Sequence, residues 1–180
     1  MFADIGIGAL LGLGVGKLFN EPNLWLFVVL GVFFALLPDL DFIVELVKHG
    51  RVGGKEEKEH RNLFHFPLLF IPLIVVMFFV SIPVGTLFAL CVLSHFIHDS
   101  FGIGWGIKWG YPFIKHAHKL EKVNGKYTVV SRAEEELKKV IAELGDPDWI
   151  KNLYLRPSKV AIIEFSIFVL SAIVLFVVLG

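Results

Sequence analysis

The sequence is poor in cysteine and in charge. Its single cysteine, Cys91, lies inside an apolar run, so no intramolecular disulfide can form and a buried, space-filling role is expected. Only 19% of the 180 residues are charged, whereas 56% are hydrophobic, a balance outside the range of ordinary soluble domains. The composition therefore predicts an integral membrane protein.

The chain also lacks a net charge, because 17 basic residues balance 17 acidic ones. Without an overall positive field, there is no electrostatic reason to expect a nucleic-acid partner. No basic leader precedes the first apolar run, so this run does not have the form of a signal peptide. We therefore expect it to be retained.

Apolar segments that are expected to be transmembrane helices cover 3–19, 24–38, 64–80, 82–100 and 160–179. A helix needs roughly 20 residues to cross the hydrocarbon core, so the first two segments are expected to be thin, tilted or partly re-entrant. The predicted fold class is an all-α integral membrane protein with about five transmembrane helices and a small cytoplasmic hairpin-helix insertion between the fourth and fifth. The predicted divisions are a membrane domain, 1–112, a loop module, 113–158, and a C-terminal transmembrane helix, 159–180.

Lysine and arginine predict the orientation of these helices. Of the 17 basic residues, all but Lys17 lie between the second and third segments or between the fourth and fifth. A five-span topology places both loops on one side, which the positive-inside rule makes cytoplasmic. The sequence thus predicts a multi-pass protein of the inner (cytoplasmic) membrane whose N-terminus is cytoplasmic.

Histidine and aspartate gather at the predicted cytoplasmic ends of these segments. Ionisable groups are rare in hydrocarbon and are usually functional there. Crowded carboxylates repel one another unless they are neutralised, so a bound cation is the simplest explanation. The residues concerned are Asp4, Asp39, Asp41, His60, His65, His95, His98 and Asp99.

Spacing favours some of these residues over others as ligands. His95 and Asp99 are four residues apart, so they project from one face of a helix and can reach one ion. His98 lies on the other flank of that helix. His60 and His65 are five residues apart, so they converge only if a helix begins between them, which the proline that follows favours.

Each group also has a structural explanation. Asp39 and Asp41 could complement the N-terminus of an interfacial helix, and His95 with Asp99 could form a hydrogen-bonded clasp between helices. His60 lies in a charged loop, where a lone histidine is usually solvated. Whether further histidines join a site is left open for His98, His116 and His118.

Three motifs carry a family resemblance. LPDLD, HRNLFH and LSHFIHD occur in this order and precede a stretch rich in glycine and tryptophan. This pattern resembles the YdjM-type membrane-bound metal-dependent hydrolases, also described as LexA-binding and inner-membrane-associated, over roughly residues 1–112. Carried over residue by residue, the resemblance implies a site made of Asp39, Asp41, His60, Arg61, His65, His95 and Asp99.

The sequence departs from that family pattern in two places. Asp4 stands where the family usually has a histidine, and a carboxylate can still bind a hard or borderline metal. Phe64 and Phe66 flank His65 in place of the threonine and serine of the family motif, which removes a hydroxyl that could support the ligand. The predicted metal ligands are Asp4, Asp39, Asp41, His60, His65, His95 and Asp99.

The predicted function is metal-dependent hydrolysis at the cytoplasmic membrane face. The ligand set suits one or two divalent transition-metal ions, with Zn²⁺ first and Mn²⁺ or Fe²⁺ as alternatives. Asp41 is the candidate general base and Arg61 the candidate clamp for a phosphate oxygen. The expected partners are the lipid bilayer and a phosphoester substrate, such as a phospholipid or a lipid-linked phosphate.

Two other functions remain open. A metal-ion or proton-coupled transporter would place its polar groups near the bilayer midplane. A non-catalytic membrane scaffold would need the same groups to satisfy one another without metal.

The loop module has its own local signals. An Asn-Gly pair at 124–125 predicts a tight hairpin turn. Leu137, Val140, Ile141 and Leu144 fall on one face of a predicted helix. We expect this stripe to dock on the hairpin or on the membrane surface, and a lid over the site or a partner-binding face is the alternative.

Overall fold

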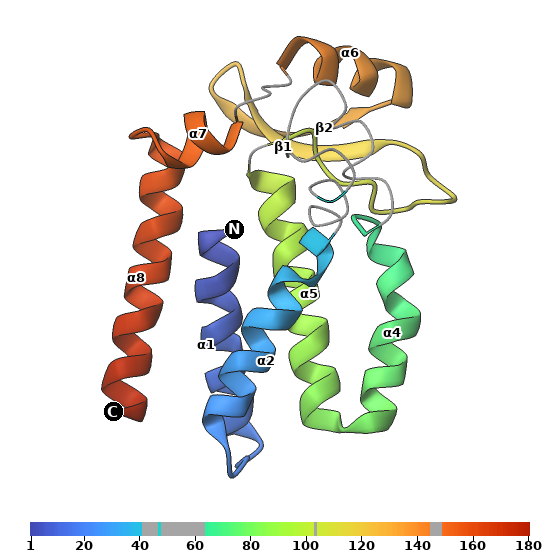
Figure 1. Ribbon diagram of the computed structural model, residues 1–180. Coiled ribbons are helices and arrows are strands. Elements are labelled where there is room, and N and C mark those ends of the chain that lie inside the picture. Colours follow the sequence, from blue (N-terminus) through green and yellow to red (C-terminus); the bar gives the residue numbers. More distant parts are fainter. Residues whose placement is uncertain (41–46, 48–63, 103, 145–148) are drawn as a thin grey trace. The chain divides into compact units, whose positions relative to one another are not determined.

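The computed structural model describes residues 1–40, 47, 64–102, 104–144 and 149–180. The apolar segments are all helical (Figure 1): α1 (Phe2–Leu18), α2 (Leu24–Leu36) continued by the 3-10 turn η1 (Leu37–Leu40), α4 (Pro67–Val80), α5 (Ile82–Phe101) and α8 (Lys159–Leu179). The segment between α5 and α8 forms β1 (Ala117–Val123), β2 (Lys126–Arg132), α6 (Glu134–Leu144) and α7 (Trp149–Tyr154). The described chain is therefore mostly helical, with one two-stranded sheet.

The length of the helices limits how many can cross a bilayer. In the described residues, α5 and α8 are the two helices long and apolar enough to do so. Only 11% of the apolar window of α8 is buried, whereas a core helix of a soluble protein is mostly buried. Helix α1 has 17 residues and α4 has 14, or about 21 Å for α4 against a core of about 30 Å. The predicted five-span architecture is thus not confirmed.

Local sequence sets where several helices begin. Asn23 caps α2 by accepting a hydrogen bond from the Leu26 N–H at 3.0 Å, and Ser158 caps α8 by accepting one from the Ala161 N–H at 3.0 Å. Such caps satisfy backbone donors that have no partner within the helix. Pro67 occupies the first position of α4, where a missing N–H costs nothing.

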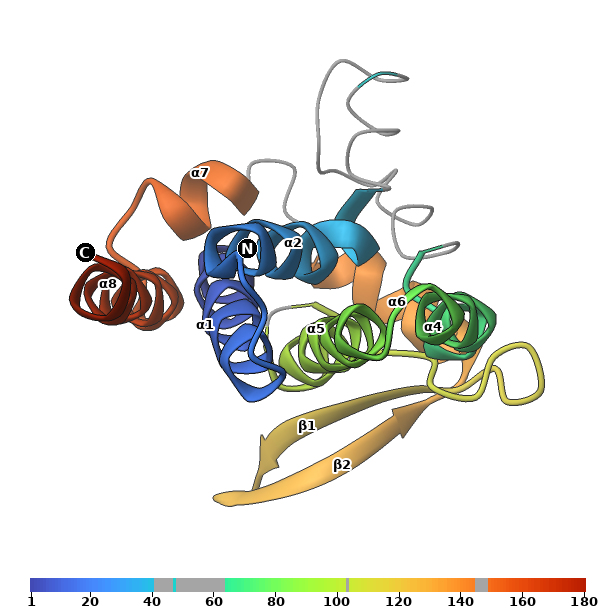
Figure 2. The same cartoon turned by 90° about the horizontal axis from the view of Figure 1, so that it is seen from below.

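One compact unit comprises Met1–Pro38, Pro72–His95 and Ile150–Gly180. Within it α1 packs against both α2 and α8, as the view from below in Figure 2 illustrates. Glycines on α1 allow close backbone approach, since a Cβ on Gly12 would overlap the carbonyl oxygen of Phe27. Ala9, Leu13 and Val28 form the buried core between α1 and α2. Packing through small residues is typical of helix pairs in membranes.

The second unit comprises Asp39–Ile71 and Phe96–Trp149. Its strands pair antiparallel from Ala117 opposite Arg132 to Val123 opposite Lys126. Asn124 and Gly125 have φ values of 50° and 81°, so the predicted tight turn is confirmed. The apolar stripe of α6 docks on this hairpin. The contact is a buried cluster of Ala117, Leu137 and Ile141, and Trp105 packs against this cluster. The predicted domain boundaries at 112 and 158 stay predictions.

Candidate metal centre

The candidate ligands lie at the ends of apolar helices. Asp39 lies in η1, directly after α2, and His65 lies two residues before α4 begins. His95 and Asp99 occupy the last two turns of α5, which ends at Phe101. Asp39, His65 and Asp99 therefore lie within three residues of a point where an apolar helix stops or starts, and His95 lies about one turn further inside α5.

His65 stands between two carboxylates. Its Nε2 lies 3.4 Å from Asp99 Oδ2 and 3.6 Å from Asp39 Oδ1, and its side chain is only 1% exposed. Nitrogen–oxygen hydrogen bonds are usually about 2.7–3.2 Å long, so both separations exceed that range. Ligand atoms roughly 2.0–2.1 Å from a tetrahedral Zn²⁺ lie about 3.4 Å from one another. The spacing around His65 therefore fits donors arranged around one cation.

The imidazole ring of His95 is oriented by a hydrogen bond to the backbone. Its Nδ1 lies 2.8 Å from the Ala35 carbonyl oxygen, and since a carbonyl only accepts, Nδ1 carries the proton and donates. In the neutral ring the lone pair is then on Nε2, which is the form that binds metals. Asp4 Oδ1 lies 3.7 Å from the same Nδ1, and both side chains are buried. The surroundings of His95 thus select one tautomer.

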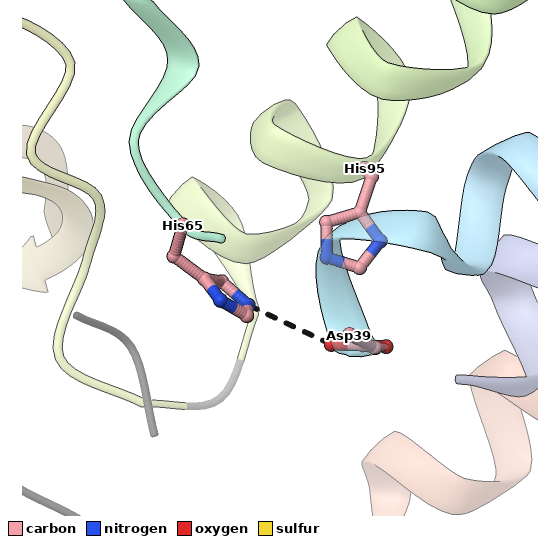
Figure 3. A group of neighbouring side chains, drawn as sticks. All are labelled: Asp39, His65 and His95. Carbon is pink, nitrogen blue, oxygen red and sulfur yellow. Dashed lines mark ion pairs between the residues drawn. The ribbon is translucent and has the colours of Figure 1, made fainter. Parts of the chain in front are cut away.

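Asp39, His65 and His95 form a group that could hold a metal ion (Figure 3). Each offers one ligand atom, and these atoms all lie within 4.8 Å of one another. The two histidines are buried, whereas the side chains of Asp39 and Asp99 are 26% and 15% exposed. Two imidazoles with carboxylates suit a divalent transition metal. The Asp99 Oδ2 that faces His65 and the Nε2 atoms of both histidines are buried, so the group is enclosed at its centre.

The structure describes only some of the other candidate ligands. Asp99 lies beside His65, and Asp4 lies beside His95. Three candidates, Asp41, His60 and Arg61, lie outside the described residues. The role of each named residue as a metal ligand stays a prediction.

One buried acidic residue was missed at the sequence level. Glu164 of α8 is 5% exposed and accepts hydrogen bonds from the Tyr154 hydroxyl at 3.1 Å and from the Phe2 N–H at 3.1 Å. Burial alone would lower the pKa of the Met1 amino group, but the carboxylates of Asp4 and Glu164 outweigh that effect and raise it. A single acidic residue in the apolar run VAIIEFSIF was the available signal.

Comparison with known proteins yields one family. The family model described as YdjM inner membrane protein matches residues 2–179, which is nearly the whole chain and extends beyond the three motifs. No curated protein and no solved structure matches the chain.

Proposed function

The chain belongs to the YdjM inner membrane protein family, and from that premise we propose that it is a membrane-embedded, metal-dependent hydrolase. Family membership supports an inner-membrane location. The proposal adds a multi-pass topology with a cytoplasmic N-terminus and a metal ion held by Asp39, His65 and His95. It also assigns a phosphoester of an amphiphilic molecule as the substrate.

The observation that carries this proposal is the spacing around His65. One buried imidazole nitrogen lies 3.4 and 3.6 Å from the oxygens of two different carboxylates. Hydrogen-bonded clasps are expected to close to shorter distances, whereas ligands around one ion are held apart by that ion.

The residues of the chain have distinct proposed roles. Asp39, His65 and His95 would hold the ion, and Asp99, whose Oδ2 lies 3.4 Å from the same His65 nitrogen, would be a further ligand. The Ala35 carbonyl fixes the ring of His95. When bound, the ion would supply Lewis-acid chemistry, polarising a phosphoryl oxygen and making water a better nucleophile at neutral pH. Asp41 accepts the proton of the water that attacks phosphorus. The phosphorus–oxygen bond to the leaving group would then break, and the leaving oxygen would take up that proton from Asp41.

The substrate class follows from the position of the ligands along the chain. Asp39 and His65 lie within three residues of a helix end, and His95 lies six residues before the end of α5. In the proposed topology this places the centre towards the headgroup side of the bilayer. Phosphoesters of lipids and lipid-linked phosphates present their scissile bonds at that level. Arg61 would bind a phosphate oxygen there. A transporter would instead need its polar groups near the midplane.

The first experiment is elemental analysis of the protein purified in detergent. We expect one or two equivalents of a divalent transition metal in the wild type. His65→Ala and His95→Ala should each lose it, because each removes a ligand from a group of three. His116→Ala is the matched control, since His116 is exposed and outside the group, and it should keep the metal. Release of phosphate from a panel of phospholipids and lipid-linked phosphates then tests turnover.

A folded wild type that takes up no transition metal, even on reconstitution, would contradict the proposal and leave the polar group as a helix clasp. Metal binding without turnover of any phosphoester would retain the centre and refute the hydrolase assignment. Equal metal loss in the control and in the site variants would show that the bound ion is elsewhere.

A further inference from the structure

Helix α6 packs on one face of the hairpin formed by β1 and β2. Side chains alternate along a strand, and directly paired residues share a face, so Ala117, Lys119 and Glu121 point to one side. Helix α6 packs on that side at Ala117 (Figure 1). Arg132 on this side donates to the carboxylate of Glu121. This hydrogen bond and the attraction of nearby cations lower the pKa of Glu121.

The opposite face has a different composition. The register places six residues on it: His118, Leu120, Lys122, Tyr127, Val129 and Ser131. None of the six is acidic. Tyr127 is 73% exposed and Val129 is 63% exposed. A basic, aromatic and aliphatic surface of this kind has the chemistry of a contact with an anionic membrane interface, where tyrosine and lysine are favoured.

The base of the hairpin is tied to the chain that leaves α5. His118 and Ile107 exchange two backbone hydrogen bonds, of 2.9 and 3.0 Å, and the Lys119 ammonium donates to the Gly104 carbonyl. Gly104 follows Phe101, the last residue of α5, by three residues, which span at most about 11 Å. Since α5 is a candidate membrane span, the hairpin is restrained to the immediate neighbourhood of a bilayer surface.

We propose that the face of the hairpin formed by Leu120, Lys122, Tyr127 and Val129 docks on the anionic headgroup surface of the membrane. Tyr127 and Val129 enter the interfacial region, and Lys122 contacts lipid phosphates. The occupant is a lipid surface rather than another protein because the exposed apolar side chains are combined with positive charge and the tether to α5 is short. This inference does not depend on the metal centre.

Adjacent residues of β2 provide the test. Val129 faces the proposed lipid side, whereas Thr128 is exposed on the side of Glu121. Val129→Cys and Thr128→Cys, each labelled with a fluorophore, would be compared in full-length protein reconstituted into nanodiscs of phosphatidylcholine with or without phosphatidylglycerol. The native Cys91 is buried, so unsubstituted protein serves as the labelling blank. Quenchers attached to lipid and quenchers dissolved in water report the depth of each label.

We expect the lipid quencher to act on the label at 129 and not on the label at 128, and only when phosphatidylglycerol is present. Lys122→Gln should lower the ratio of docked to undocked hairpin about fivefold, as expected for one basic residue at an anionic surface. Lys139→Gln removes the same charge from the exposed part of α6 and should leave the ratio unchanged.

Access of the aqueous quencher to both positions would overturn the proposal. Protection of position 129 from both quenchers would also overturn it, because it would mean that a protein surface or a second copy of the chain covers this face. Lipid quenching that does not depend on anionic lipid would refute the role given to Lys122.

Discussion

The contact between α1 and α2 leads to a prediction with a built-in control. A Cβ on Gly12 would overlap the Phe27 carbonyl oxygen and lie 2.7 Å from the carbonyl carbon of Phe27. A Cβ on Gly14, two residues further along the same helix, would meet nothing within 4 Å. Gly12→Ala and Gly14→Ala therefore make the same chemical change with opposite expected outcomes.

The expected magnitude follows from the distances. Ordinary contact begins at 3.4 Å, against 2.7 Å here, so the helices must separate by about 0.7 Å or more. A gap of that size removes roughly a quarter to a half of the dispersion energy of each affected contact, and each buried side chain makes tens of contacts worth about 0.1–0.2 kcal/mol. Overpacking typically costs about 1–3 kcal/mol. Replacing glycine by alanine stabilises a helix by up to about 1 kcal/mol. Gly12→Ala should therefore destabilise the protein by about 1–2 kcal/mol, and Gly14→Ala should not.

The free energy of unfolding of both variants would be measured from loss of helical circular dichroism in detergent. Gly12→Ala should unfold at lower denaturant concentration than the wild type, and Gly14→Ala at an equal or higher one. The same shift in both variants would mean that helix propensity alone decides, and the packing argument would be wrong. An unchanged Gly12→Ala would show that α1 and α2 do not approach each other closely.

Three further predictions concern the hairpin and the metal centre. Gly125 has φ of 81° with open space around it, so Gly125→Ala should cost about 1–2 kcal/mol of backbone strain and speed proteolysis at the turn. Hydrogen bonding from Arg132 lowers the pKa of Glu121; the pair therefore stabilises the hairpin fully above the unfolded pKa of about 4.3. That contribution is lost as pH falls through the lower folded value, and amide exchange in the hairpin should show this loss in wild type but not in Glu121→Gln. The ring of Phe66, next to His65, stacks on that of Tyr111 with the ring centroids 4.0 Å apart. Phe66→Ala removes this contact beside His65 and should weaken metal binding in a titration, whereas Phe79→Ala, at an 86% exposed position, should not.

Much of the fold could be predicted from the sequence because its signals are local. Apolar runs end at proline, asparagine or serine, and the helices begin and end within a few residues of the predicted limits. The Asn124–Gly125 pair is sufficient for the turn because both residues tolerate positive φ. The number of membrane crossings depends on tilt and bilayer thickness, so the apolar runs alone did not determine it.

The candidate site was predictable in residue type but not in its supporting contacts. Histidine and aspartate at helix ends indicate ligands for a cation, and the structure brings Asp39, His65 and His95 together. The carbonyl that orients His95 belongs to Ala35, 60 residues earlier, and a backbone acceptor has no signature in a sequence. Glu164 has a partner 162 residues away, in the Phe2 N–H, so its role could not be inferred from neighbouring residues.

These supporting contacts bear on the role of Asp4. Its carboxylate approaches His95 at Nδ1, the nitrogen that donates to the Ala35 carbonyl, and not at the nitrogen that carries the lone pair. A carboxylate on the proton-bearing side of an imidazole makes the opposite nitrogen a better ligand. Helix α1, which carries Asp4, is held at its start by Glu164 and along its length by packing at Gly12. In the proposed centre, Asp4 would therefore support His95 as a ligand from the side of Nδ1.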